Sequence, residues 1–171
     1  MPDDGKSVGE LLVRGPWIVG AYYEDEEATK AAVEPDGWFH TGDVATIDPD
    51  GYLQLTDRRK DIIKSGGEWI SSIDVENAAM AHECVAEAAC IAIPHPRWGE
   101  RPLLVIAPRP AQQPATAELI GLLAERFPRW MLPDDVAVIA EMPHTATGKI
   151  MKTKLREMFA GHQLPERPLG R

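Results

Sequence analysis

A lysine that directly follows a glycine, ahead of a segment with helical periodicity, is the first residue whose setting suggests chemistry. It ends the sequence Pro143-His144-Thr145-Ala146-Thr147-Gly148-Lys149. Gly148 permits an unusual backbone turn, which can project the Lys149 ammonium into a neighbouring site. A point charge on a flexible stem suits an anionic phosphoryl or carboxylate group. The segment is not a Walker A loop, because Pro143 and Ile150 replace the required Gly and Ser or Thr. An ordinary surface lysine is the alternative.

A second candidate is the segment DRRKDIIKSGGEW, residues 57–69. Its Gly66-Gly67 pair offers bare backbone amides that a ligand could approach closely, and an ordinary β-turn is the alternative. Arg58 can bridge polar oxygens with its planar fork of donors. The alternative for Arg58 is a surface salt bridge, which would contribute little to stability.

The third candidate is Asp43, at the end of Trp38-Phe39-His40-Thr41-Gly42-Asp43. A carboxylate beside a glycine and close to aromatic residues can accept hydrogen bonds from two hydroxyls of a ribose. An aspartate that caps a turn is an equally good interpretation of this segment alone.

Other classes of function find little support. The two cysteines are too few for a disulfide framework, and the five histidines lack metal-ligand spacing, so we expect no metal site and a reducing, cytoplasmic setting. No apolar run is long enough to span a membrane. Residues 1–50 carry twelve acids and three bases, which accounts for the whole net charge of −9. Such a surface would repel nucleic-acid phosphates.

The elements that must position these residues alternate between strands and helices without strict βαβ order, which predicts an α+β fold. Expected strands cover residues 10–14, 44–47, 52–55, 88–93, 103–108 and 136–140, with a hairpin turn at 48–51. Expected helices cover residues 24–33, 71 or 72 to 83 with a serine cap, 116–127 capped by Thr116, and 150–160, in which Met151, Leu155, Met158 and Phe159 share one side. Four consecutive charges at 57–60 suit an exposed linker between domains, and residues 163–171 are expected to fray.

Taken together, the motifs resemble one family. The order WFHTGD, DPDGYLQLTDRRKDIIKSGGEWISSIDVEN and PHTATGKI is similar to the C-terminal core motifs of adenylate-forming enzymes, over roughly residues 9–159. This superfamily includes acyl-CoA synthetases, adenylation domains of nonribosomal peptide synthetases, and luciferases. The sequence KDIIKSGGEWIS looks most like that of the fatty-acyl branch, including medium-chain and methylmercaptopropionate CoA ligases.

The resemblance implies a two-step reaction. A carboxylate attacks the α-phosphate of Mg²⁺-ATP to give an acyl-adenylate and pyrophosphate, and a thiol, usually that of CoA, then displaces AMP. The roles that the family's motifs imply are ribose binding by Asp43 and Arg58, a hinge at Lys60, a pantetheine path along Ser65, Gly66 and Gly67, and catalysis of the first step by Lys149. The hinge would let one lid serve both steps, presenting the lysine first and the glycine pair second.

The resemblance also implies that much of the enzyme lies outside this sequence. Residues 1–57 would be the last β subdomain of a large N-terminal domain, and residues 58–171 the small lid. The phosphate loop, the adenine-stacking segment and the acyl pocket are absent, so we expect the isolated chain to have no ligase activity. Two departures from the family are Trp69, where many relatives have Arg or Asn, and Asp57, which replaces a commoner Gly. The alternatives are an adenylation domain that loads a carrier-protein thiol, which the short PERPLGR tail disfavours, and a non-catalytic binding module.

Overall fold

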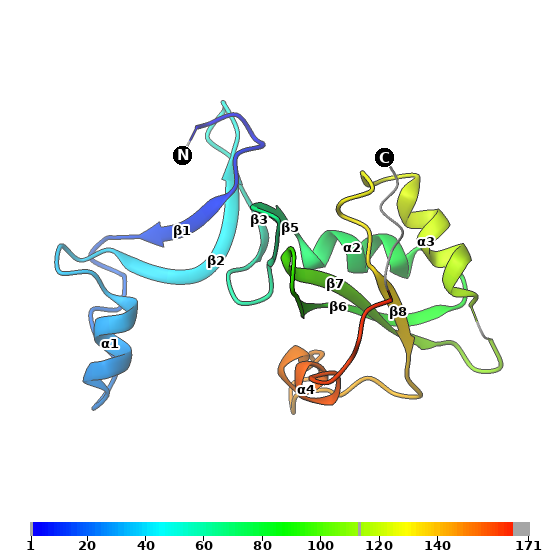
Figure 1. Ribbon diagram of the computed structural model, residues 1–171. Coiled ribbons are helices and arrows are strands. Elements are labelled where there is room, and N and C mark those ends of the chain that lie inside the picture. The colour runs from blue at the N-terminus through cyan, green and yellow to red at the C-terminus, as the bar shows by residue number, and fades with distance from the viewer. Residues whose placement is uncertain (1, 113, 166–171) are drawn as a thin grey trace. The chain divides into compact units, whose positions relative to one another are not determined.

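The computed structural model describes residues 2–112 and 114–165, and the chain divides into two compact units between Lys60 and Asp61 (Figure 1). Part of the tail that we expected to fray, residues 166–171, lies outside the described residues. None of the helices in the described parts has the length and apolar character that a bilayer span requires. The mixture of helices and sheets confirms the predicted α+β class.

The first unit is built on a three-stranded antiparallel sheet in the order β1-β2-β3. Its elements are β1 (Gly9–Val13), α1 (Glu26–Ala32), β2 (Phe39–Ile47) and β3 (Leu53–Arg58). The predicted hairpin turn joins β2 to β3, where Asp48 Oδ1 accepts hydrogen bonds from the amides of Asp50 and Tyr52. Strand β2 begins five residues before the expected residue 44, because its first half pairs with β1, a distant partner that local pattern does not reveal.

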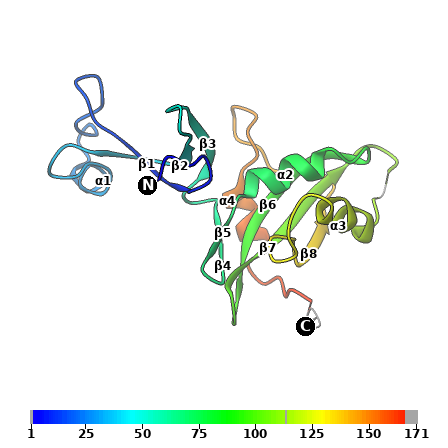
Figure 2. The same ribbon diagram turned by 90° about the horizontal axis from the view of Figure 1, so that it is seen from above.

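The second unit contains a five-stranded sheet, ordered β5-β4-β7-β6 with β8 also paired to β7. Its strands are β4 (Ile63–Ser65), β5 (Glu68–Ile70), β6 (Val85–His95), β7 (Gly99–Pro108) and β8 (Asp135–Val138). Antiparallel β6 and β7 stay in register from Glu87 opposite Ala107 to His95 opposite Gly99, whereas β8 runs parallel to β7. Helices α2 (Ser72–Met80) and α3 (Thr116–Ala124) cover one face and α4 (Lys152–Met158) the other (Figures 1 and 2).

Alternate residues of β6 and β7 supply the apolar cores on the two faces of this sheet, because successive strand side chains point to opposite sides. On the face of α2 and α3, the two strands contribute Ala88, Cys90, Leu104 and Ile106. On the face of α4, they contribute Ala89, Ile91, Ile93, Leu103, Val105 and Ala107. Burial on both faces explains why these strands are almost continuously apolar in sequence.

Helix ends test the predicted caps. Ser71 caps α2, since its hydroxyl accepts a hydrogen bond from the amide of Asp74, but the helix ends at Met80, before the expected residue 83. The prediction that Thr116 caps α3 is wrong. Ala115 occupies the N-cap position without a side-chain hydrogen bond, and Thr116 is the first helical residue. In α4, Leu155 is fully buried while Met158 is 52% exposed, so Met158 does not belong to the expected apolar side.

Candidate functional site

The segment Pro143–Lys149, which we call the lysine turn, folds back on itself between β8 and α4. The Thr145 amide donates to the Lys149 carbonyl at 2.8 Å, and the Gly148 amide donates to the Thr145 carbonyl at 2.9 Å. Gly148 has a φ of +79°, so the turn uses the backbone freedom that the sequence predicted. Lys149 is exposed, and among the residues that the structure describes no group pairs with its ammonium. The turn therefore leaves the Lys149 ammonium exposed at the surface of the second unit.

Two side-chain contacts fix the ends of the lysine turn to the rest of the second unit. At its start, His144 Nε2 lies 2.6 Å from Glu87 Oε1 on β6. Just after its end, the Lys152 ammonium lies 2.6 Å from Glu76 Oε1 and donates to the Ser72 hydroxyl at 2.7 Å, both on α2. The Lys152 pair is largely shielded from water, with side chains 14% and 16% exposed. These contacts hold the backbone that carries Lys149 while its side chain stays free to reach outward.

The pair Gly66 and Gly67, which we call the glycine turn, joins β4 to β5. Both residues have positive φ, +62° and +93°, and Ser65 pairs with Glu68 across the turn. A two-residue hairpin with positive φ at both central positions is the geometry that demands glycine. The segment therefore forms a tight β-turn. We expected the Gly66 amide to be bare, but it donates to the Trp98 carbonyl at 2.9 Å.

Ser65 differs from what the predicted ligand path would require of its side chain. The residue is 6% exposed, and its hydroxyl accepts a hydrogen bond from Arg101 Nη1 at 2.9 Å. The Ser65 side chain is thus committed to the interior of the domain. The predicted role of Ser65 in a thiol path therefore depends on its position beside the glycine turn and not on direct contact by its hydroxyl.

The two candidate ribose ligands are neighbours in the first unit. Asp43 on β2 lies directly opposite Arg58 on β3, and Arg58 Nε is 3.5 Å from Asp43 Oδ1. Their side chains are 31% and 59% exposed, so this pair contributes little to stability. The structure thus brings together two residues that were predicted from separate motifs, at a place where both can meet a ligand. Asp43 lies inside a strand, so its interpretation as a turn cap was wrong.

The expected linker is only partly exposed. Asp57 is 4% exposed, and its carboxylate accepts a hydrogen bond from the Arg58 amide at 2.7 Å, so the linker interpretation is wrong for Asp57. Lys60, the expected hinge, is exposed, and the division between the units falls directly after it. The next residue, Asp61, accepts a hydrogen bond from Arg156 of α4 at 2.6 Å. The second unit is therefore tied to its own helix from its first residue.

Comparison with known proteins identifies these features as those of a family. Residues 74–149 match the AMP-binding enzyme C-terminal domain. The chain is 52% identical to a long-chain-fatty-acid–CoA ligase from Thermus thermophilus, over 95% of this chain and 30% of that protein. It is 49% identical to a 3-methylmercaptopropionyl-CoA ligase from Ruegeria lacuscaerulensis, over 93% of this chain and 29% of that protein. The chain belongs to the adenylate-forming enzymes. It spans about 30% of the length of these relatives and corresponds to their C-terminal portion.

Solved structures of adenylate-forming enzymes have the same fold. ATP-bound MatB from Rhodopseudomonas palustris matches 93% of this chain with a TM-score of 0.83 and 28% identity, and the match covers 31% of MatB. The o-succinylbenzoate CoA synthetase of Bacillus subtilis, in complex with its acyl-adenylate intermediate, matches 90% of this chain with a TM-score of 0.79 and 32% identity, over 31% of the synthetase. The strands and turns described above are therefore those of an adenylate-forming enzyme.

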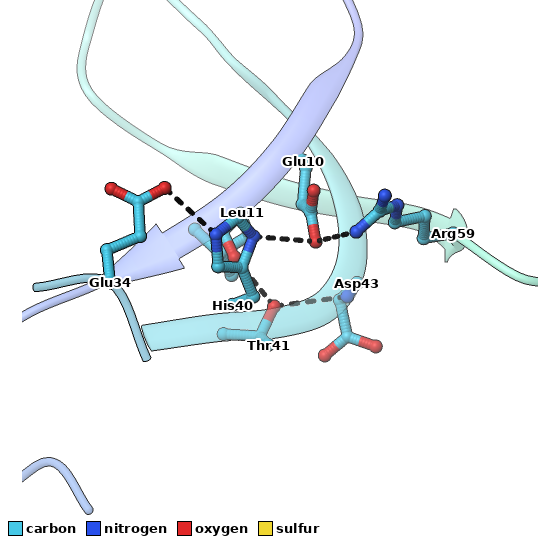
Figure 3. Close-up of polar contacts among 7 residues, drawn as sticks. All are labelled: Glu10, Leu11, Glu34, His40, Thr41, Asp43 and Arg59. Carbon is cyan, nitrogen blue, oxygen red and sulfur yellow. Dashed lines mark hydrogen bonds and ion pairs between the residues drawn. The ribbon is translucent and has the colours of Figure 1, made fainter. Parts of the chain in front are cut away.

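A histidine cluster that lies near Asp43 was not predicted from the sequence (Figure 3). His40 Nε2 lies 3.0 Å from Glu34 Oε1, and His40 Nδ1 lies 3.2 Å from Glu10 Oε1, which also contacts Arg59 Nη1 at 3.3 Å. The hydrogen bonds and charges of Glu10 and Glu34 raise the pKa of His40 above its ordinary value of 6.5. Glu10 lies far from His40 in sequence, so only the pairing of β1 with β2 could have revealed this cluster.

The same strand carries a polar link to the Asp43 backbone. The Thr41 hydroxyl donates to the Leu11 carbonyl at 2.8 Å and accepts from the Asp43 amide at 3.1 Å (Figure 3). Between them, Gly42 has a φ of +72°. Thr41 therefore fixes the turn of backbone at Gly42 that orients the Asp43 carboxylate.

Protonation of His40 is expected to make the stability of the first unit depend on pH. A pKa that folding raises adds stability that is complete below pH 6.5 and is lost as the pH rises through the higher, folded value. We expect Glu34→Gln to lower the His40 pKa and to shrink this dependence. An NMR titration of the His40 ring in both proteins measures the shift. A wild-type His40 that titrates at or below 6.5 would contradict the prediction.

Replacing Gly66 by alanine is expected to destabilise the second unit. The new Cβ would lie 2.9 Å from Trp98 Cε3, and the φ of +62° costs an L-residue about 1–2 kcal/mol before that contact is counted. Gly121→Ala is the matched control, because Gly121 lies in α3 with no atom within 4 Å of its added Cβ. The control should gain about 0.5–1 kcal/mol in the free energy of unfolding, measured by denaturant titration. Equal stability of the two variants would refute the argument.

Proposed function

We propose that the full-length protein containing this chain is an AMP-forming acyl-CoA ligase that activates a carboxylic acid, of the fatty-acid class, and transfers the acyl group to CoA. ATP and CoA are its co-substrates. No cluster of three His, Cys, Asp or Glu residues that could hold a metal occurs within residues 2–112 and 114–165. Mg²⁺ enters the proposal as the complex of ATP, since it is commonly held by substrate phosphates.

The observation that carries the proposal is that one rigid sheet holds two different turns at opposite ends. The lysine turn is tied to β6 through Glu87, and the glycine turn is tied to the β6–β7 connection through Trp98. Along β6, Glu87 and His95 are eight residues apart, roughly 25 Å at the usual rise of a strand. A single body cannot bring both turns to one reaction centre at once. A two-step reaction with a reorienting lid gives both turns a purpose.

We assign the roles as follows. In the first step Lys149 lies between the incoming carboxylate and the α-phosphate of ATP, where its charge offsets their repulsion and the charge that develops in the transition state. Asp43 and Arg58 hold the ribose hydroxyls. Lys60 is the hinge about which the second unit then turns. In the second step the glycine turn lines the path by which the CoA thiol reaches the acyl-adenylate.

The experiment that tests the proposal uses the full-length protein with a series of carboxylic acids. We expect AMP, pyrophosphate and acyl-CoA in equal amounts, with the rate depending on acyl chain length. Formation of ADP and phosphate would contradict the mechanism. Acylation of a carrier protein in preference to free CoA would favour the carrier-loading alternative, and no reaction with any acid would favour a non-catalytic module. We place the enzyme in the cytoplasm, in keeping with Cys84 and Cys90, which form no disulfide.

The isolated chain is expected to be inactive. It holds Lys149 and the ribose pair, but most of the nucleotide site and the acyl pocket belong to the rest of the enzyme, and catalysis of this kind depends on positioning all partners together. Purified 171-residue protein should form no acyl-CoA above background in the assay used for the full-length enzyme. Detectable ligation by the chain alone would show that it carries a complete site.

A further inference from the structure

A buried arginine lies at the base of the glycine turn. Arg101 on β7 is 7% exposed, and its guanidinium binds the Asp134 carboxylate in two places, Nε to Oδ2 at 2.9 Å and Nη2 to Oδ1 at 2.7 Å. Its other donors reach the carbonyls of Trp130 at 2.6 Å and Leu132 at 3.0 Å and the hydroxyl of Ser65 at 2.9 Å. All five N–H groups of the guanidinium are therefore used, one of them on the residue that precedes the glycine turn.

The hairpin that carries the glycine turn has little other support from the sheet. Strands β4 and β5 have three residues each, and β4 pairs with β7 only through Ser65 opposite Gly99. Besides this pairing, the Gly66 amide donates to the Trp98 carbonyl, and the Lys64 amide donates to the Glu100 carboxylate at 2.8 Å. Trp98 lies in the β6–β7 connection, and Gly99 and Glu100 are the first two residues of β7. The hairpin also anchors in the core through the buried side chains of Ile63 and Ile70, at the ends of β4 and β5 away from the turn. Among the polar contacts named here, that of Arg101 comes from a buried side chain and ends next to the turn itself.

Such a group is a poor device for stability alone. Removing a guanidinium and a carboxylate from water costs much of what their attraction returns, and apolar side chains of the same volume often serve a core as well. What a buried, fully bonded guanidinium adds is a fixed geometry, because its planar fork sets the direction of each partner. Here that geometry ends on the Ser65 hydroxyl.

We propose that Arg101 is a positioning residue for the thioester-forming step: through Ser65 it fixes the glycine turn in the orientation that admits the thiol. The inference rests on the proposed function, because it assigns a purpose to the same site. Arg101 is buried and acts through Ser65, without contact to a substrate. Its effect is confined to the step that uses the glycine turn, and the lysine turn, which other residues hold, is unaffected.

The test compares Arg101→Lys and Ser65→Ala with wild type in the full-length enzyme. Lysine keeps the positive charge but cannot form the fork, and Ser65→Ala removes one hydroxyl and leaves the Asp134 pair intact, so it tests the proposal even if Arg101→Lys folds poorly. Thioester formation from presynthesised acyl-adenylate should fall about tenfold in each, the size expected for one charge-assisted hydrogen bond. The double variant should be no slower than the single ones, because both remove the same contact.

Three controls separate positioning from a general structural role. Pyrophosphate release from ATP and acid should stay near the wild-type rate in both variants, and Ser65→Thr, which keeps the hydroxyl, should restore thioester formation. Arg109→Lys is the matched arginine control, since Arg109 follows the end of β7 away from the glycine turn and its Nε donates to the Glu83 carbonyl at 2.9 Å. It should leave both steps unchanged. Equal losses in the two steps for Ser65→Ala would overturn the proposal.

A measurement that needs no catalysis keeps this proposal distinct from the proposed function. Amide hydrogen exchange at Gly66 and Gly67 in the full-length protein should become faster in Ser65→Ala, while exchange in β6 and β7 stays slow. Unchanged exchange at the glycine turn would refute the positioning role whatever the enzyme's activity. If the wild-type full-length protein makes no acyl-CoA but Ser65→Ala still exchanges faster at the glycine turn, the positioning of the turn is supported and only the ligase function is rejected.

Discussion

Lys149→Ala in the full-length enzyme is expected to slow acyl-adenylate formation by about 10²- to 10³-fold, the usual effect of removing one group that stabilises transition-state charge. Thioester formation from presynthesised acyl-adenylate should be nearly unaffected, because AMP leaves from a preformed adenylate and, in the proposed mechanism, the lysine turn is withdrawn during this step. Pyrophosphate release measures the first step, and acyl-CoA measures the second.

Lys154→Ala is the control for this prediction. Lys154 is a nearby lysine in α4 whose ammonium contacts Glu157 at 3.0 Å, with its side chain 53% exposed. The control removes the same charge a few residues away, outside the lysine turn. We therefore expect both steps to be unchanged. Equal loss of both steps in Lys149→Ala would mean that the residue holds structure, and no loss in either would overturn its catalytic role.

Asp134→Ala is expected to give the largest loss of stability, about 3–5 kcal/mol in the free energy of unfolding, because it leaves the buried Arg101 guanidinium without its main partner. Both side chains of this ion pair are only 8% exposed. Denaturant unfolding of the 171-residue chain, followed in the second unit, measures the effect.

Two comparisons sharpen this prediction. Glu157→Ala breaks the exposed pair with Lys154 and should cost less than about 0.5 kcal/mol. The double variant Arg101→Met, Asp134→Leu removes both charges and should recover most of the stability that Asp134→Ala loses. If Asp134→Ala is as stable as wild type, water reaches the Arg101 guanidinium and replaces the carboxylate.

Local chemistry predicted the parts of this fold that depend on near neighbours. Ser71 caps α2 because its hydroxyl needs only the amide of Asp74, three residues on. The glycine turn was recognisable because positive φ at consecutive positions has few other solutions. Thr116 failed as a cap because the backbone enters α3 one residue earlier, which the hydroxyl of Thr116 does not decide.

Features that depend on distant partners could not be predicted in this way. Asp57 belongs to a run of charges and looks exposed, yet it is buried at the end of β3 where that strand pairs with β2. The partners of Arg101 lie 29 to 36 residues away, in a loop after α3 and in the β4–β5 hairpin, and only the folded sheet brings them together. The motifs thus indicated which residues carry chemistry, while the groups that hold them in place became visible only in three dimensions.

The two-sided sheet also bears on how the protein is made. During synthesis β6 and β7 are complete, with α2 already available for one face, well before the last helix leaves the ribosome. On the other face, Ile91, Leu103 and Val105 share a core with Leu155 of α4, which is translated later. A nascent chain therefore exposes an apolar strip until α4 has been made, and we expect proteins terminated before α4 to aggregate and to depend on chaperones.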